Sequence, residues 1–153
     1  MLASPVVPLP PVAPAPSTLD AAVDAAVSKI KAAKRPIVWA GVELQRFHVE
    51  DTFASLIDAS ALPFATSLLG KSVLSEDNPH YIGVYEGKSS NVGVQPLVQN
   101  SDCLIGLGIL TTDINLLGIT GVTGDSLTGV VPWSDQFILA ANDAVRVGTQ
   151  YFA

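Results

Sequence analysis

Short apolar runs that alternate with segments of helical spacing are the feature that most constrains how this chain folds. The clearest run, residues 37–40, reads Ile-Val-Trp-Ala and is apolar on both faces of an extended backbone; similar runs follow at 63–67 and 103–108. Strands that are apolar on both faces are typical of a parallel sheet, because helices cover both sides of such a sheet. The pattern therefore predicts an α/β fold.

Helical spacing occupies the segments between these runs. Ser17 and Asp20 form a weak capping box, and apolar residues at helical spacing continue from there to Ala33. A second helix, between the first two apolar runs, is predicted from the spacing of Val49, Phe53, Leu56 and Ile57. A third, shorter helix is predicted over residues 92–99.

The remaining segments are less regular. Residues 68–90 contain glycines, charges and Asn78-Pro79, which predicts a long connection with one short helical turn. Short apolar runs at 130–131, 137–140 and 145–147 indicate further strands. Because strands that alternate with helices need right-handed crossovers, we expect a three-layer, doubly wound, Rossmann-like domain whose mostly parallel sheet has about six strands.

The N-terminal residues differ in composition from the rest of the chain. Six of the 11 prolines lie among the first 19 residues, which carry no charge. Prolines at this density exclude a membrane-spanning helix and a signal-peptide core, and no later run is both long and apolar enough to cross a bilayer. We interpret residues 1–16 as an extended, semi-rigid interdomain linker with a domain attached upstream, and residues 17–153 as one domain.

Charge and cysteine content exclude several classes of partner. Eight basic residues against 14 acidic ones give a net charge of −6, which argues against nucleic acid and anionic membranes as partners. Charged residues make up only 14% of the chain, so we expect a hidden interface, with flanking domains and further copies of the chain as partners. The single cysteine excludes internal disulfides and fits a cytoplasmic location.

Several segments, taken in order, match a known family. The chain resembles the central domain of thiamine diphosphate-dependent 2-oxo acid decarboxylases of the pyruvate and indolepyruvate decarboxylase type, from about residue 19 to residue 153. The segments that carry this resemblance are 35–46 (RPIVWAGVELQR), 63–66 (PFAT), 69–73 (LGKSV), 78–87 (NPHYIGVYEG), 100–104 (NSDCL) and 110–115 (LTTDIN).

The resemblance implies that the reactive groups lie on other domains. In that family a pyrimidine-binding domain supplies the glutamate that activates the cofactor, and a diphosphate-binding domain supplies the Gly-Asp-Gly motif that holds Mg2+ and the diphosphate. Gly124-Asp125-Ser126 lacks the last glycine of that motif and is interpreted as a turn. We therefore expect a central domain that is inactive alone, in a parent enzyme that is a carboxy-lyase. Its expected role is structural, and it could also transmit effector signals between the flanking domains.

A nucleotide-binding domain is the alternative, since the central domains of related acetolactate synthases hold FAD. The chain would then be an FAD- or ADP-binding domain of an acetolactate synthase or oxalyl-CoA decarboxylase type enzyme. The Arg-Phe-Asp-Asp-Arg segment of those flavin binders has no counterpart after Gly108, so we expect an empty groove and no cofactor on this domain. Ligands of doubly wound folds bind at the carboxyl ends of the strands. The groove candidates are therefore Gly41, Glu43, Arg46, Gly108, Asp113, Asn142 and Asp143.

Several individual side chains allow a structural interpretation as well as a functional one. Glu43 and Arg46 could form an ion pair, or Arg46 could bind the carboxylate of a 2-oxo acid. Lys71 is interpreted as a loop cation that contacts a neighbouring domain, and Cys103 as a buried, unreactive thiol. The two histidines share no metal-ligand spacing, so no metal site is expected.

Overall fold

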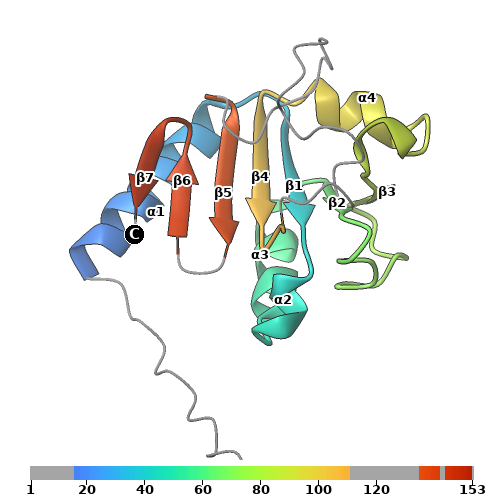
Figure 1. The fold of residues 1–153 in the computed structure, drawn as a ribbon, viewed down its shortest axis with the longest axis horizontal. Coiled ribbons are helices and arrows are strands. Elements are labelled where there is room, and N and C mark those ends of the chain that lie inside the picture. Colours follow the sequence, from blue (N-terminus) through green and yellow to red (C-terminus); the bar gives the residue numbers. More distant parts are fainter. Residues whose placement is uncertain (1–15, 111–134, 142–143, 153) are drawn as a thin grey trace, which may run out of the picture.

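A seven-stranded sheet with helices on both faces forms the fold in the computed structural model, which describes residues 16–110, 135–141 and 144–152 (Figure 1). The helical elements are α1 (Pro16–Ala32), α2 (Glu43–Arg46), α3 (Glu50–Ser60), the 3-10 turn η1 (Gly87–Ser89) and α4 (Val94–Gln99). The strands are β1 (Pro36–Ala40), β2 (Phe64–Thr66), β3 (Tyr81–Val84), β4 (Cys103–Leu107), β5 (Phe137–Ala141), β6 (Ala144–Val147) and β7 (Gln150–Phe152).

The sheet is mostly parallel, as predicted. Its strand order is β3-β2-β1-β4-β5-β6-β7, and every neighbouring pair from β3 to β5 is parallel. The last two pairings, β5 with β6 and β6 with β7, are antiparallel. The predicted three-layer Rossmann-like class is therefore confirmed, with an antiparallel hairpin added at one edge.

Two strands were not predicted, so the described sheet has seven strands where about six were expected. β3 lies within residues 68–90, which were predicted to be a connection. It is an edge strand of four partly exposed residues, with an irregular register against β2 and a φ of 120° at Gly83. β7 was also missed, and the strand expected at residues 130–131 lies outside the described residues.

The described first helix already includes Pro16 and Ser17, so Ser17 is not the N-cap that the predicted capping box requires. Proline suits the first turn of a helix, because no backbone donor is needed there. The connection from α1 to β1 is fastened to the start of β4. The backbone N–H groups of Lys34 and Arg35 donate to the Asp102 carboxylate, over 2.9 Å and 2.7 Å. These two hydrogen bonds lower the pKa of Asp102.

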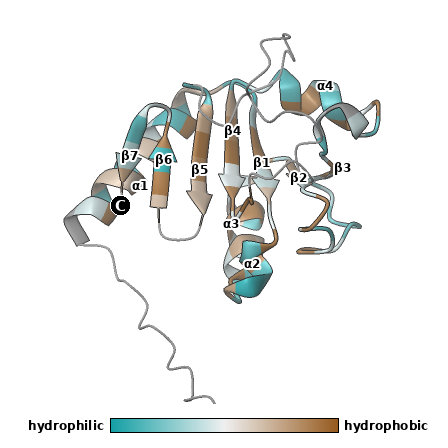
Figure 2. Ribbon diagram, viewed as in Figure 1, coloured by the Kyte–Doolittle hydropathy of each residue, from teal (hydrophilic) through white to brown (hydrophobic). Residues whose placement is uncertain are grey.

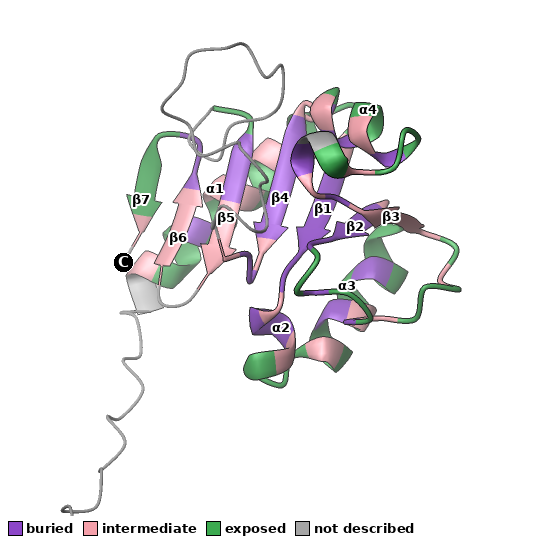
Figure 3. Ribbon diagram, turned by 45° about the vertical axis from the view of Figure 1, so that its right-hand side comes forward, coloured by how far each residue is buried: buried purple, intermediate pink, exposed green. Residues whose placement is uncertain are grey.

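Two apolar cores cover the two faces of the sheet. Trp39, Tyr85 and Val98 belong to the core under α4, where the Trp39 and Tyr85 rings meet edge to face with centroids 5.3 Å apart. Phe64 and Ile57 belong to the core on the opposite face, under α1 and α3. Figure 2 shows the hydrophobic central strands, and Figure 3 shows that they are also the most buried part of the fold.

Candidate functional site

The strand order places a topological switch point between β1 and β4. The chain runs from β1 to β2 and β3 on one side, then returns to place β4 on the other side of β1. The loops after β1 and β4 therefore leave the sheet in different directions. In doubly wound folds, this divergence opens the crevice in which ligands bind.

Here the backbones of the two loops meet at that crevice. The Gly41 N–H donates to the Leu107 carbonyl over 2.8 Å, and the Glu43 N–H donates to the Gly108 carbonyl over 3.1 Å. A Cβ on Gly41 would overlap the Gly108 carbonyl and lie 2.6 Å from Ile109 Cα. Gly108 has a φ of 61°, a conformation that glycine adopts without strain. Direct backbone contact therefore fills the base of the crevice.

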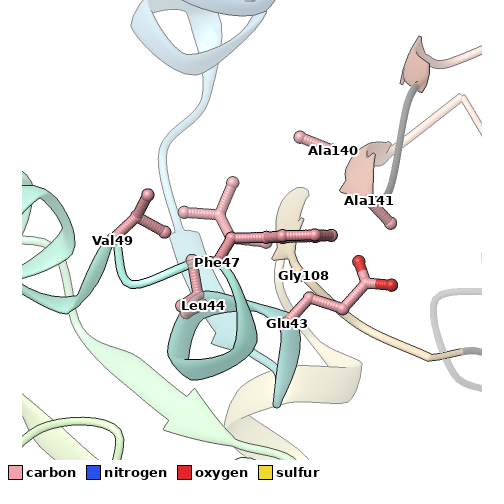
Figure 4. A pocket seen from close by; sticks show the side chains of 8 residues that line it. Glu43, Leu44, Phe47, Val49, Gly108, Ala140 and Ala141 are labelled. Atoms are coloured by element: carbon pink, nitrogen blue, oxygen red, sulfur yellow. The ribbon is translucent and has the colours of Figure 1, made fainter. Parts of the chain in front are cut away.

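A small pocket of about 250 Å3 remains beside this contact. Glu43 lies in it with only 7% of its surface exposed. Figure 4 shows its carboxylate turned toward Ala141 at the end of β5, with Phe47 lying across the pocket. The lining residues are Glu43, Leu44, Phe47, Val49, Leu107, Gly108, Ala140 and Ala141. These described lining residues are therefore apolar apart from the Glu43 carboxylate.

The structure brings three of the predicted groove residues together. Gly41, Glu43 and Gly108 meet at the carboxyl ends of β1 and β4. Arg46 is exposed on α2, and no ion pair links it to Glu43, although both residues are described. The other candidates, Asp113, Asn142 and Asp143, lie outside the described residues.

The apolar pocket residues were not predicted as site residues. Phe47 is 55% exposed and follows the four-residue helix α2, so its side chain reaches the pocket only because of the turn that the chain makes there. His48 has a φ of 55° in that same turn. No local sequence pattern indicates this arrangement.

The described lining of this pocket does not fit a diphosphate or its Mg2+ ion. None of the described lining residues is basic, and the Glu43 carboxylate would repel a diphosphate. Across the residues that the structure describes, no three His, Cys, Asp or Glu side chains gather as a metal site requires.

A larger and more polar hollow of about 600 Å3 lies along the outer edge of β3. On one side of it Lys71 and Glu76 form an ion pair, with 3.8 Å between Nζ and Oε1 and both side chains about half exposed. Such an exposed pair contributes little to stability. Tyr81 Oη lies 3.3 Å from Thr66 Oγ1 at the same edge. The hollow carries charges of both signs, so it selects no class of ligand by charge.

Cys103 is fully buried, as predicted, and burial raises the pKa of its thiol. A raised pKa keeps the thiol protonated and therefore a poor nucleophile. Within the described ranges, no helix has both the length and the apolar character needed to cross a bilayer.

Comparisons with known proteins agree with the sequence resemblance. The family model for the thiamine pyrophosphate enzyme central domain matches residues 23–152. A pyruvate decarboxylase of Aspergillus fumigatus is 33% identical over 105 residues, which cover 69% of this chain and 18% of that protein. An alpha-keto-acid decarboxylase of Mycobacterium leprae is 32% identical over 112 residues, 69% of this chain and 20% of that protein.

Plant relatives give the same result. Pyruvate decarboxylase 3 of Arabidopsis thaliana is 32% identical over 100 residues, which cover 65% of this chain and 17% of that protein. The chain thus spans 17–20% of the length of these relatives. Since the family model covers most of the chain, the chain belongs to the family of thiamine pyrophosphate enzyme central domains.

Proposed function

We propose that this chain acts as the non-catalytic central domain of a thiamine diphosphate-dependent 2-oxo acid decarboxylase of the pyruvate or indolepyruvate type. Its role is to hold the flanking pyrimidine- and diphosphate-binding domains in register, and those domains hold thiamine diphosphate and Mg2+. The family match and the names of the relatives support the class of parent enzyme. The parent, in this proposal, is a homo-oligomer.

The observation that carries the structural role is the closed base of the crevice. Ligand pockets usually have volumes of roughly 300–1,000 Å3 and a few converging polar groups. The pocket at this switch point has about 250 Å3, and its described lining carries one carboxylate. Gly41 and Gly108 are in backbone contact at its base. A crevice narrowed in this way suits a supporting role better than the binding of a cofactor.

Nucleotide binding is the second candidate, and one observation favours it. Glu43 places a buried carboxylate at the carboxyl end of β1, where an acidic residue can accept hydrogen bonds from ribose hydroxyls. The described lining residues argue against it, because none of them is basic and they give a nucleotide's phosphates no charge partner. Calorimetric titration with ADP and with FAD separates the two candidates: heat that saturates, and that Glu43→Gln abolishes, would favour the nucleotide site.

A domain exchange tests the structural role directly. Residues 17–153 replace the corresponding domain of the Aspergillus fumigatus pyruvate decarboxylase, and CO2 release from pyruvate is measured with thiamine diphosphate and Mg2+ present. We expect the chimera to decarboxylate pyruvate, and the 153-residue chain alone to release no CO2. The exposed Val92 offers a matched control, because Val92→Ser should leave the chimera's rate unchanged.

Two outcomes of this exchange contradict the proposal. One is turnover of pyruvate by the isolated chain, which would place reactive groups on this domain. The other is a chimera that is folded and oligomeric by circular dichroism and ultracentrifugation, binds the cofactor, and yet is inactive. In that case the central domain would contribute to the reaction itself, which a purely supporting role does not include.

A further inference from the structure

An apolar groove of about 330 Å3 lies between α1 and α3, on the face of the sheet opposite α4. Its walls are Leu19, Val23 and Val27 of α1 and Leu56 of α3, and its floor includes Ile105 and Ile138. The four wall side chains are between 40% and 50% exposed. Exposed aliphatic side chains that converge on one groove indicate a docking surface.

The groove lies between the positions at which the two helices pack on this face of the sheet. α1 packs on β6 and β7, and α3 reaches β2, where Phe53 and Phe64 meet edge to face with centroids 5.6 Å apart. β1, β4 and β5 lie between these positions, and residues of all three strands line the groove. Neighbouring strands are about 4.8 Å apart, so β2 and β6 lie roughly 19 Å apart. A helix has a half-width of about 5–6 Å, so a strip of roughly 8 Å remains between the two helices, enough for one extended segment.

The N-terminal segment has the composition and the repeat to fill this strip. Residues 5–12 read Pro-Val-Val-Pro-Leu-Pro-Pro-Val, with a proline at every third position from Pro5. A polyproline II helix has three residues per turn, so Val6, Leu9 and Val12 would share one edge of it. That edge is aliphatic like the groove walls, while the backbone carbonyls of such a helix remain available to water.

The place where the segment joins the fold also suits this groove. α1 begins at Pro16, three residues before Leu19 in the groove wall. Fifteen residues of polyproline II extend about 46 Å, and the 17 residues of α1 about 25 Å, so the segment is long enough to turn back along the whole groove. Neither residues 1–15 nor the groove lining contains a charged side chain.

We propose that residues 5–12 dock in this groove, with Val6, Leu9 and Val12 packed between α1 and α3. The segment then runs antiparallel to α1. Eight residues of polyproline II from Val12 span about 25 Å, so Ser4 lies past Val27, at the C-terminal end of α1 and far from its first turn. The linker is thereby fastened to its own domain. This inference stands on the groove and the repeat, and it does not depend on the proposed function.

Paramagnetic relaxation in methyl NMR spectra of the full chain tests the docking. A nitroxide is attached through Ser4→Cys, since Cys103 is fully buried and takes no label in the native protein. Docking predicts signal loss for the methyl groups of Val27 and Leu56, with no loss for the exposed Val92. A free segment would instead affect Leu19 most, and that pattern overturns the proposal.

Two controls separate docking within the chain from other causes. Leu9→Asp together with Val12→Asp places charges on the packed edge, and it should restore the Val27 and Leu56 signals without changing the rest of the spectrum. A mixture of nitroxide-labelled chain at natural isotope abundance with isotope-labelled chain lacking the nitroxide should show no loss. Loss in the mixture would mean that a second copy occupies the groove, and would overturn docking within one chain.

Discussion

Replacing Gly41 by alanine tests whether backbone contact really closes the crevice. The added Cβ would overlap the Gly108 carbonyl and lie 2.6 Å from Ile109 Cα, so the loops after β1 and β4 must separate. Overpacking costs about 1–3 kcal/mol, and the two backbone hydrogen bonds across the contact contribute about 0.5–1.5 kcal/mol each. We expect Gly41→Ala to lower the free energy of unfolding by roughly 2–6 kcal/mol.

Urea unfolding followed by tryptophan fluorescence measures this loss, and Gly93→Ala is the matched control. A Cβ on Gly93 would meet nothing closer than Asn91 Oδ1 at 3.7 Å, and Gly93 has a φ of −83°, which alanine adopts readily. Gly93→Ala should therefore be neutral or stabilise by up to about 1 kcal/mol. The reasoning fails if Gly41→Ala and Gly93→Ala unfold within about 1 kcal/mol of each other.

Three further predictions follow from titratable groups. Because hydrogen bonds from Lys34 and Arg35 lower the pKa of Asp102 in the folded state, its carboxylate stabilises the fold above its ordinary pKa, and this contribution is lost as the pH falls through the lowered value. Asp102→Asn should flatten the acid limb of the urea midpoint measured against pH, and an unchanged limb would refute this. The raised pKa and burial of Cys103 predict that a thiol reagent reacts only at the rate of unfolding; fast labelling in native buffer would contradict it. Burial raises the pKa of Tyr85, partly opposed by its hydrogen bond to Gln99, so its phenolate should form at a higher pH than that of free tyrosine. Ultraviolet difference titration of the chain and of Tyr85→Phe checks this: if Tyr85→Phe removes absorbance that develops at the pH of free tyrosine, the prediction is wrong.

The central strands could be predicted because both of their faces are buried. Residues 37–40 and 103–107 need apolar side chains at nearly every position, and that requirement is visible in the sequence itself. In a parallel sheet the carboxyl ends of the strands lie at one edge, so Gly41 and Gly108 could both be named as groove candidates there. These inferences rest on local patterns and on topology, which a single sequence carries.

The edge strands and the pocket lining depend on information that the local pattern does not contain. β3 is short and only partly buried, so its residues follow neither alternation nor a continuous apolar run. Phe47 reaches the pocket through a turn whose direction is set by tertiary packing. One signal for β7 was present: a two-residue loop containing Gly148, whose φ is 58°, joins β6 to β7, as in a tight hairpin.

The antiparallel hairpin at the sheet edge also decides where the chain leaves the fold. β7 packs on α1, so Phe152 ends beside the helix with which the described fold begins, as Figure 1 shows. The described fold therefore begins and ends in the same part of the molecule. A domain whose two ends lie close together tolerates circular permutation and insertion into another protein, because a short span of polypeptide is enough to join its ends.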